Sequence, residues 1–306
     1  MKNTESLLSV QNLSVSFKTD DGWKQVVHGI SYDVYRGKTL GLVGESGSGK
    51  TVSSLVCMGL LPEKTARVDG GSIVYKGQSL LENHFEGARQ QRGCSIAMIF
   101  QEPMTSLNPS MRCGEQVEEV IAAHLKLTKQ EGKKRVVDLF REVELPEPES
   151  IGKRYPHELS GGQKQRVMIA IALAADPDLI IADEPTTALD VTVQRAVIDL
   201  LHRLKESRGL GLIFISHDLD VVGAVADDIV VLQHGNIRET GRTIDILTNP
   251  QDPYTIKLLS CKPPTSGDRR PLADPENTKP YQFSIGTSPI LAVRKLKKTF
   301  VTKKSL

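Results

Sequence analysis

Eight residues in the first fifth of the chain have the types and spacing needed to bind phosphate. They follow the apolar stretch 39–43 and read Gly44-Glu45-Ser46-Gly47-Ser48-Gly49-Lys50-Thr51. Glycines let successive backbone N–H groups converge on an anion, and Lys50 adds a cation for the β- and γ-phosphates of a nucleotide. Thr51 offers a hydroxyl to Mg²⁺, and a helix from about Gly49 would aim its positive end at the same anion. A plain glycine-rich turn is the alternative, but the full pattern favours nucleotide binding.

Two adjacent carboxylates follow a short apolar run later in the chain. Residues 179–182 read Leu-Ile-Ile-Ala and predict a buried parallel strand, with Asp183 and Glu184 at its carboxyl end. Open α/β sheets place ligand chemistry at that end. Asp183 suits Mg²⁺, which prefers oxygen ligands, and Glu184 could act as general base on an attacking water. The alternative for Glu184 is a solvated loop carboxylate.

His217 and Gln101 each follow another predicted strand, 211–216 and 95–100. Parallel strands end at one edge of a sheet, so we expect both side chains near Asp183. A histidine that only caps Asp218, and a glutamine that is only solvated, are the structural alternatives.

A second potential anion site lies at Ser160-Gly161-Gly162-Gln163, before the apolar helix predicted over 167–175. Ser160 is a good N-cap, and the glycines leave backbone N–H groups bare at the helix start. An ordinary capped helix explains Ser160 but not paired glycines, which lower helix propensity.

The order of these segments resembles the ATP-binding cassette (ABC) ATPases. Gln101 corresponds to the Q-loop of that family, residues 160–163 to its signature, and 215–218 to its switch-histidine segment; Ala188-Leu189-Asp190 is similar to the D-loop. The resemblance implies ATP and Mg²⁺ as ligands, with Thr51, Gln101 and Asp183 at the metal.

The same resemblance implies how the parts cooperate. Glu184, His217 and Gln101 would act on the γ-phosphate and water. Two cassettes would pair head to tail, so that Ser160, Gly161, Gly162 and Gln163 close over the nucleotide of the partner. Asp190 of the D-loop is a further candidate for nucleotide binding. Related proteins carry an aromatic residue at the end of the first strand, which makes Phe17 the candidate for stacking on adenine. Trp23 is its competitor, and core packing of Phe17 is the structural alternative.

Three further segments resemble one group of ABC proteins, the ATPases of bacterial dipeptide, oligopeptide, glutathione and nickel importers. These segments are Phe100–Pro109, Arg154–Glu158 and Asn249–Thr255. Members of that group often carry several cysteines after the last segment, ascribed to an iron–sulfur cluster. Here only Cys261 falls in that region, so we expect no cluster.

The resemblance therefore implies an ATP-hydrolysing subunit of an importer, with a peptide or glutathione as the expected cargo. Its implied partners are a second cassette, two membrane permease subunits and an extracytoplasmic solute-binding protein. Its implied location is the cytoplasmic face of the inner membrane, as a peripheral subunit. The alternatives are a nickel importer ATPase, a soluble ABC ATPase without a transport role, and a nonfunctional remnant.

Composition fits this interpretation and weakens others. The chain has 306 residues, with 39 basic and 37 acidic side chains and a formal net charge of +2, so no strong field for nucleic acid is indicated. The four cysteines show no CxxC pair, which argues for a reducing compartment and against zinc. No apolar run approaches the ~20 residues that span a bilayer.

The expected fold class is α/β, a P-loop NTPase (RecA-like) core with an antiparallel β subdomain and an inserted α-helical subdomain. Alternating residues predict antiparallel strands over 7–17 and 26–35, a further strand over 71–75, and a closing hairpin around 234–235. Helical periodicity predicts the helical subdomain over about 102–158. The cassette would cover residues 7–260 and a linker 261–290.

Residues 291–306 repeat the opening of the chain. Leu, Val, Leu, Phe and Thr recur in register between 8–19 and 291–302 at a constant offset of 283. This pattern favours the start of a truncated second cassette, as in the first half of a tandem two-cassette importer ATPase. A solvated basic tail is the alternative, since 291–306 hold six Lys or Arg and no acidic residue.

Overall fold

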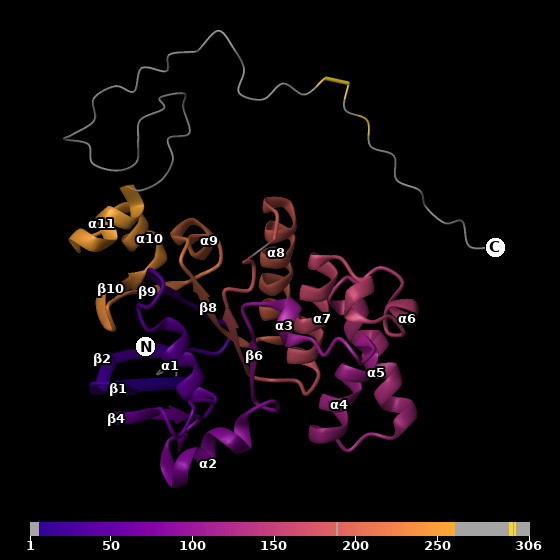
Figure 1. The fold of residues 1–306 in the computed structure, drawn as a ribbon, viewed down its shortest axis with the longest axis horizontal. Helices are drawn as coiled ribbons and strands as arrows, with labels where there is room; N and C mark the ends of the chain where they lie inside the picture. The colour runs from indigo at the N-terminus through magenta and orange to yellow at the C-terminus, as the bar shows by residue number, and fades with distance from the viewer. Residues whose placement is uncertain (1–5, 188, 261–293, 296, 298–306) are drawn as a thin grey trace. The chain divides into compact units, whose positions relative to one another are not determined.

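A six-stranded sheet carries the parallel strands of the protein (Figure 1). The structure is a computed structural model that describes residues 6–187, 189–260, 294, 295 and 297. The strand order is β10-β9-β3-β8-β7-β6, and every neighbouring pair is parallel except β10 with β9. The strands are β3 (Thr39–Val43), β6 (Ile96–Ile99), β7 (Leu179–Asp183), β8 (Gly211–Ser216), β9 (Asp228–Gln233) and β10 (Asn236–Arg242).

This sheet is covered on both faces, which explains its unbroken apolar strands. Every residue of β7 and β8 is buried. Alternate side chains of a strand point to opposite faces, so Ile180 and Phe214 join one hydrophobic cluster while Ile181 and Ile213 join the other. The carboxyl ends of β3, β7 and β8 are thereby held at one edge.

A four-stranded antiparallel sheet, in the order β2-β1-β4-β5, forms the second sheet. Its strands are β1 (Leu8–Thr19), β2 (Gly22–Val34), β4 (Ala66–Tyr75) and β5 (Gln78–Ser79). β4 is longer than the predicted 71–75, because its first half pairs with the end of β1, as in Phe17 with Ala66. The pairing shifts register near Gly71, where a Cβ would lie 2.6 Å from the Asn12 carbonyl oxygen, so glycine interrupts the pattern without ending the strand.

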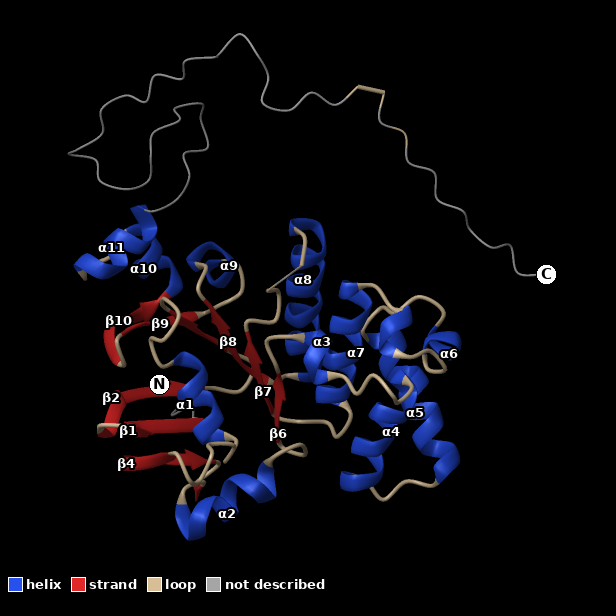
Figure 2. Cartoon of the chain, viewed as in Figure 1, coloured by secondary structure: helices blue, strands red, loops and turns tan. Residues whose placement is uncertain are grey.

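Helices fill the chain between β6 and β7, as the periodicity predicts (Figure 2). They are α3 (Pro103–Ser106), α4 (Cys113–His124), α5 (Lys129–Glu142), α6 (Pro148–Ile151), a 3₁₀ turn (Pro156–Glu158) and α7 (Gly161–Leu173). Val117 and Ile121 of α4 pack with Leu139 and Phe140 of α5 in one buried cluster. Residues 102–158 are called the helical subdomain below. α7 follows its predicted N-cap Ser160; it begins at Gly161, six residues before the apolar stretch 167–175, and ends at Leu173 rather than at 175.

The remaining helices are α1 (Lys50–Cys57), α2 (Glu82–Gln91), α8 (Val191–Arg208), α9 (Leu219–Gly223), α10 (Thr243–Thr248) and α11 (Pro253–Ser260). Within the described residues, no helix combines the length and apolar character needed to cross a membrane. The predicted fold class, an α/β core with an antiparallel β subdomain and an inserted helical subdomain, is confirmed.

Candidate active site

The phosphate loop, residues 44–51, turns from the end of β3 into α1. Gly44, Gly47 and Gly49 all have positive φ, at 154°, 79° and 100°. At Gly44 a Cβ would lie 2.0 Å from the Leu232 carbonyl oxygen, so only glycine fits beside β9. Gly49 is the N-cap of α1 and provides no side-chain cap, which leaves the first N–H groups of the helix available to an anion.

The Lys50 ammonium is folded into this loop. Its side chain is buried, and Nζ donates to the carbonyl oxygens of Gly44 at 2.7 Å and Glu45 at 2.9 Å. Burial lowers the pKa of Lys50, while the carboxylates of Glu184, Asp183 and Glu45 act in the opposite direction. Phosphate oxygens are stronger acceptors than carbonyls, so Lys50 can exchange these bonds for a nucleotide.

Asp183 connects β7 to the phosphate loop. The Thr51 hydroxyl donates to Asp183 Oδ1 at 3.1 Å, and Asp183 is only 3% exposed. Burial raises the pKa of Asp183; the bond from Thr51 lowers it and the neighbouring Glu184 raises it. A hydroxyl next to a carboxylate is an oxygen donor set that fits Mg²⁺.

Glu184 accepts two hydrogen bonds on one carboxylate oxygen. Gln101 Nε2 donates to Glu184 Oε2 at 3.0 Å and the Thr187 hydroxyl donates to the same atom at 2.9 Å. His217 Nδ1 lies 3.4 Å from it. The pairing of Asp183 with Ile215 aligns the ends of β7 and β8, which brings His217 and Glu184 together. Glu184 has φ +45°, a strained conformation typical of functional positions.

The signature residues form a capped helix start. Ser160 Oγ accepts from Gln163 N at 3.4 Å, and Gln163 Oε1 accepts from Ser160 N at 3.0 Å, a capping box. At Gly162 a Cβ would lie 2.7 Å from Val193 Cγ1, so the close approach of α8 is one reason for this glycine. Among the described residues, no hydrogen bond joins the signature to the phosphate loop of the same chain.

Three other candidates have structural partners. Asp190 Oδ1 accepts from Val193 N at 2.9 Å and caps α8. Phe17 is half-buried against the hydrophobic cluster of the β subdomain. Trp23 is 42% exposed, with the Arg67 guanidinium 4.4 Å from its ring centroid.

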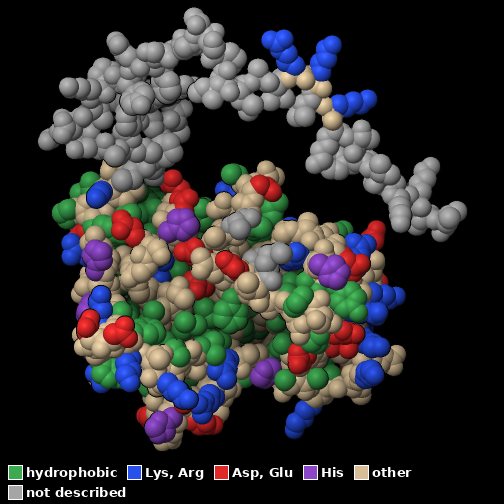
Figure 3. Space-filling view, viewed as in Figure 1, with side chains coloured by type: hydrophobic (Ala, Val, Ile, Leu, Met, Phe, Trp, Pro, Cys, Tyr) green, Lys and Arg blue, Asp and Glu red, His purple; other side chains and the backbone are tan. Residues whose placement is uncertain are grey.

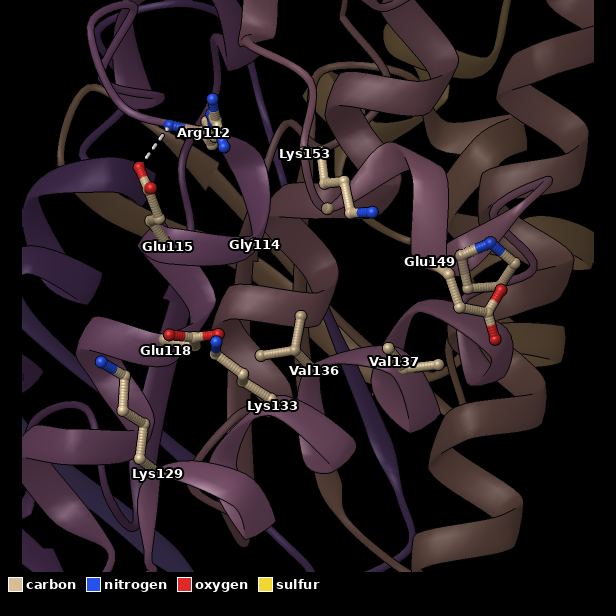
Figure 4. A pocket seen from close by; sticks show the side chains of 12 residues that line it. Arg112, Gly114, Glu115, Glu118, Lys129, Lys133, Val136, Val137, Glu149 and Lys153 are labelled. Carbon is tan, nitrogen blue, oxygen red and sulfur yellow. Dashed lines mark hydrogen bonds between the residues drawn. The ribbon is translucent and has the colours of Figure 1, made fainter.

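A charged cavity lies in the helical subdomain, apart from the groups just described (Figure 4). Arg112, Lys129, Lys133 and Lys153 line it together with Glu115, Glu118 and Glu149, so four cations face three carboxylates. Glu115 Oε2 accepts from Arg112 N at 3.0 Å. The near balance of charge gives this cavity no clear preference for an anionic ligand, and we assign it no chemistry.

Comparison with known families agrees with this geometry. The family model described as "ABC transporter" matches residues 27–187, from β2 through the phosphate loop to the turn after Glu184. The chain belongs to the ABC transporter family. Its cassette is therefore an ABC ATPase, as the order of motifs predicts.

Two curated relatives from Bacillus subtilis (strain 168) are similar over most of this ABC protein. The dipeptide transport ATP-binding protein DppD is 44% identical over 280 residues, covering 92% of this chain and 84% of the relative. The oligopeptide transport ATP-binding protein OppD is 46% identical over 257 residues, covering 84% and 72%.

A solved ABC cassette has the same fold. The dimeric post-hydrolysis structure of the ATP-binding cassette MJ0796, bound to ADP and Pi, superposes with a TM-score of 0.69 at 25% identity. The match covers 77% of this chain and 98% of that cassette. ATP is thus the nucleotide of this family.

The structure brings six of the predicted site residues into one connected group: Lys50, Thr51, Gln101, Asp183, Glu184 and His217. Their catalytic and metal-binding roles remain predictions. Thr187 and Tyr254 were not predicted. Thr187 lies three residues after Glu184, and Tyr254 lies in the segment 249–255, whose resemblance to importer ATPases gave no role to any residue.

Some predictions fall outside the described residues. Ala188 of the D-loop, Cys261 and the linker 261–290 are not described, and of the repeat over 291–306 only residues 294, 295 and 297 are.

Proposed function

We propose that this protein hydrolyses ATP with Mg²⁺ to drive import of peptides through a membrane permease. One observation carries the catalytic part. Glu184 directly follows β7, accepts a hydrogen bond from Gln101 and lies next to His217. Its neighbour Asp183 accepts a hydrogen bond from Thr51 of the phosphate loop.

The chain's own groups have distinct roles in this proposal. Lys50 and N–H groups of residues 44–51 other than that of Glu45, which donates to Tyr254, bind the β- and γ-phosphates. Glu184 accepts a proton from the attacking water, while His217 and Gln101 orient the γ-phosphate and that water. Thr51, Asp183 and Gln101 would hold Mg²⁺, which neutralises developing phosphate charge when bound. Phosphate oxygens and water would complete the oxygen ligands that Mg²⁺ prefers.

A second cassette would complete the site. Ser160 and Gly161 are exposed at the start of α7, and among the described residues no hydrogen bond joins them to the phosphate loop of their own chain. Head-to-tail pairing would place them, with Gly162, Gln163 and Asp190, over the partner's nucleotide. The dimeric state named for MJ0796 supports this arrangement.

An apolar groove suits the permease. It lies between the core and the helical subdomain and is lined by Met58, Leu60, Arg92, Gly93, Ala97, Met98, Phe100, Val120, Ile171 and Ala172. Figure 3 shows hydrophobic side chains gathered across the middle of the face in view, which is the face seen in Figure 1. Phe100 is 42% exposed there and directly precedes Gln101. A permease segment bound in this groove would contact Phe100, whose neighbour Gln101 hydrogen-bonds Glu184. This contact would form on the cytoplasmic side of the inner membrane.

The names of DppD and OppD favour a peptide cargo over nickel, delivered by an extracytoplasmic solute-binding protein to two permease subunits.

We also propose that residues 291–306 begin a second cassette. A phosphate loop within about 40 residues after position 306 in the reading frame would support this, and unrelated sequence would leave the basic-tail alternative.

The test is hydrolysis by the purified full chain. Phosphate release from ATP should require Mg²⁺ and be lost in Lys50→Ala, together with ATP affinity. Transport is tested separately, in proteoliposomes containing the neighbouring permease genes and the binding protein. Dipeptide uptake supports the proposed cargo, and nickel uptake without peptide uptake overturns it.

A further inference from the structure

The C-terminal helix α11 reaches the phosphate loop. Tyr254, its second residue, accepts a hydrogen bond on Oη from the backbone N–H of Glu45 at 3.2 Å. These residues lie 209 positions apart in sequence. Tyr254 belongs to the segment 249–255, to which the proposed function assigns no task.

Tyr254 is firmly held. It is 5% exposed and packs in the same hydrophobic cluster as Val231 and Ile246. Its N–H donates to Asp252 Oδ1 at 2.8 Å. Asp252 N in turn donates to the Glu239 carboxylate of β10 at 3.2 Å. A chain of bonds therefore runs from the sheet through Asp252 to Tyr254, and fixes where the hydroxyl lies.

Glu45 is held from two directions. Its N–H donates to Tyr254, and its carbonyl accepts from Lys50 Nζ at 2.9 Å. The loop has a backbone support as well, since Gly235 N donates to Ser48 O at 3.1 Å. Ser53 Oγ, three residues further along α1, donates to the Lys50 carbonyl at 2.7 Å, whereas Tyr254 reaches the loop backbone from a helix that is distant in the sequence.

We propose that Tyr254 is a positioning residue for the phosphate loop, so that α11 sets the affinity of the cassette for nucleotide. The inference rests on the proposed binding of ATP at residues 44–51. The Glu45 N–H belongs to the same planar peptide as the Gly44 carbonyl, so Tyr254 fixes one of the two carbonyls that Lys50 must leave to reach phosphate. It also preorganises the turn that presents the other N–H groups of the loop. Burial raises the pKa of the Tyr254 hydroxyl, which keeps the phenol neutral at physiological pH.

Tyr254→Phe tests this, because it removes one oxygen and keeps the ring. The Kd for a fluorescent ATP analogue should rise about 3- to 10-fold, the range for one hydrogen bond. The kcat at saturating ATP should stay within about twofold, since Glu184 is untouched. Hydrogen exchange in the peptide that contains Glu45 should become faster.

Tyr75→Phe is the matched control. Tyr75 is also buried, and its hydroxyl donates to Asp178 Oδ2 at 3.0 Å, just before the amino end of β7 and away from the phosphate loop. This variant should leave the Kd and the exchange of Glu45 unchanged, whatever its effect on Tm.

The outcomes separate the inference from the proposed function. If Lys50→Ala loses nucleotide binding while Tyr254→Phe binds like the unmodified protein, the positioning role is wrong and the proposed site stands. If Lys50→Ala binds ATP normally, the proposed site itself is wrong. If the Tyr75 and Tyr254 variants raise the Kd equally, the effect of Tyr254 comes from general loss of packing and not from its bond to Glu45.

Discussion

The side-chain amide of Gln101 donates to Glu184 Oε2 over 3.0 Å and so joins the start of the helical subdomain to the end of β7. Gln101 directly follows Phe100, which lines the apolar groove. A shift of the helical subdomain would therefore move a direct partner of Glu184. Thr187, by contrast, comes from the same turn as Glu184 and would keep its bond.

Glu184→Gln should retain ATP affinity and lose hydrolysis by about 100-fold or more, because the amide cannot accept the proton of the attacking water. The variant should also accumulate as an ATP-bound dimer, since the step that reopens the pair is blocked. Phosphate release and size-exclusion chromatography with ATP measure the two effects.

Glu63→Gln is the control for that change. Glu63 pairs with Arg89 on the surface and is 72% exposed, so its loss should leave hydrolysis unaffected. Near-normal turnover in Glu184→Gln would show that Glu184 is not the general base.

Thr187→Val should lower kcat about 10-fold while leaving the KM for ATP nearly unchanged. Valine matches the shape of threonine but cannot donate to Glu184 Oε2, so the carboxylate loses a bond that fixes its orientation. Thr187→Ser keeps the hydroxyl and should restore most of the activity. If the valine variant keeps normal activity while the serine variant is impaired, the methyl packing of Thr187 matters and its hydroxyl does not.

The sheet was predictable because it is buried on both faces. β3 and β8 match the predicted ranges 39–43 and 211–216, since continuous apolar runs leave little choice of boundary. The first half of β4 was not predicted: it carries Arg67 and Asp69 on an exposed surface, and glycines separate it from the apolar half. The N-cap of α7 at Ser160 was predicted and is confirmed, whereas the apolar run over 167–175 marks only the second half of the helix and extends two residues past its end.

The grouping of the site was predictable from topology alone. Residues that follow parallel strands must meet at one edge, which is why Gln101, Asp183 and His217 lie together. The contact of Tyr254 with Glu45 left no trace in local spacing, because it depends on how α11 packs after the whole sheet is assembled. The reason for glycine at 162 likewise required the position of Val193.

Ser160→Ala should nearly abolish hydrolysis while leaving ATP affinity of the isolated monomer close to normal, if the signature serves the nucleotide of the partner. A helix cap alone contributes about 1 kcal/mol to stability, so the variant should fold. Steady-state phosphate release and fluorescent-nucleotide titration at low protein concentration distinguish the two quantities.

Thr128→Ala provides a matched comparison. Thr128 caps α5 through the same capping box, with its hydroxyl accepting from Glu131 N at 3.3 Å. If Ser160 only capped a helix, both alanine variants would lose similar stability and keep similar activity. A selective loss of hydrolysis in the Ser160 variant supports the composite site, and loss of ATP binding by its monomer contradicts it.

Asp183→Asn should make the protein more stable in the absence of nucleotide and inactive in its presence. Burial raises the pKa of Asp183, so its ionisation disfavours the folded state as pH rises through that pKa. Removing the charge at pH 7 should raise Tm by about 2–4 °C, the shift that ~1 kcal/mol gives in a domain of this size. The gain should vanish toward pH 3, where Asp183 is protonated in both states.

Asp227→Asn should change stability in the opposite direction. Burial acts to raise the pKa of Asp227, but Lys38, the Thr39 N–H and Lys205 outweigh it, so the pKa is lowered. Its ionised form therefore stabilises the fold above the unfolded pKa, and that contribution is lost as pH falls through the folded pKa. At pH 7 the Asn variant should have a lower Tm. Thermal scans of both variants from pH 3 to 8 test the contrast. If Asp183→Asn also has a lower Tm at pH 7, the Asp183 carboxylate stabilises the fold. The proposal that it destabilises the free protein and is needed for Mg²⁺ would then be wrong.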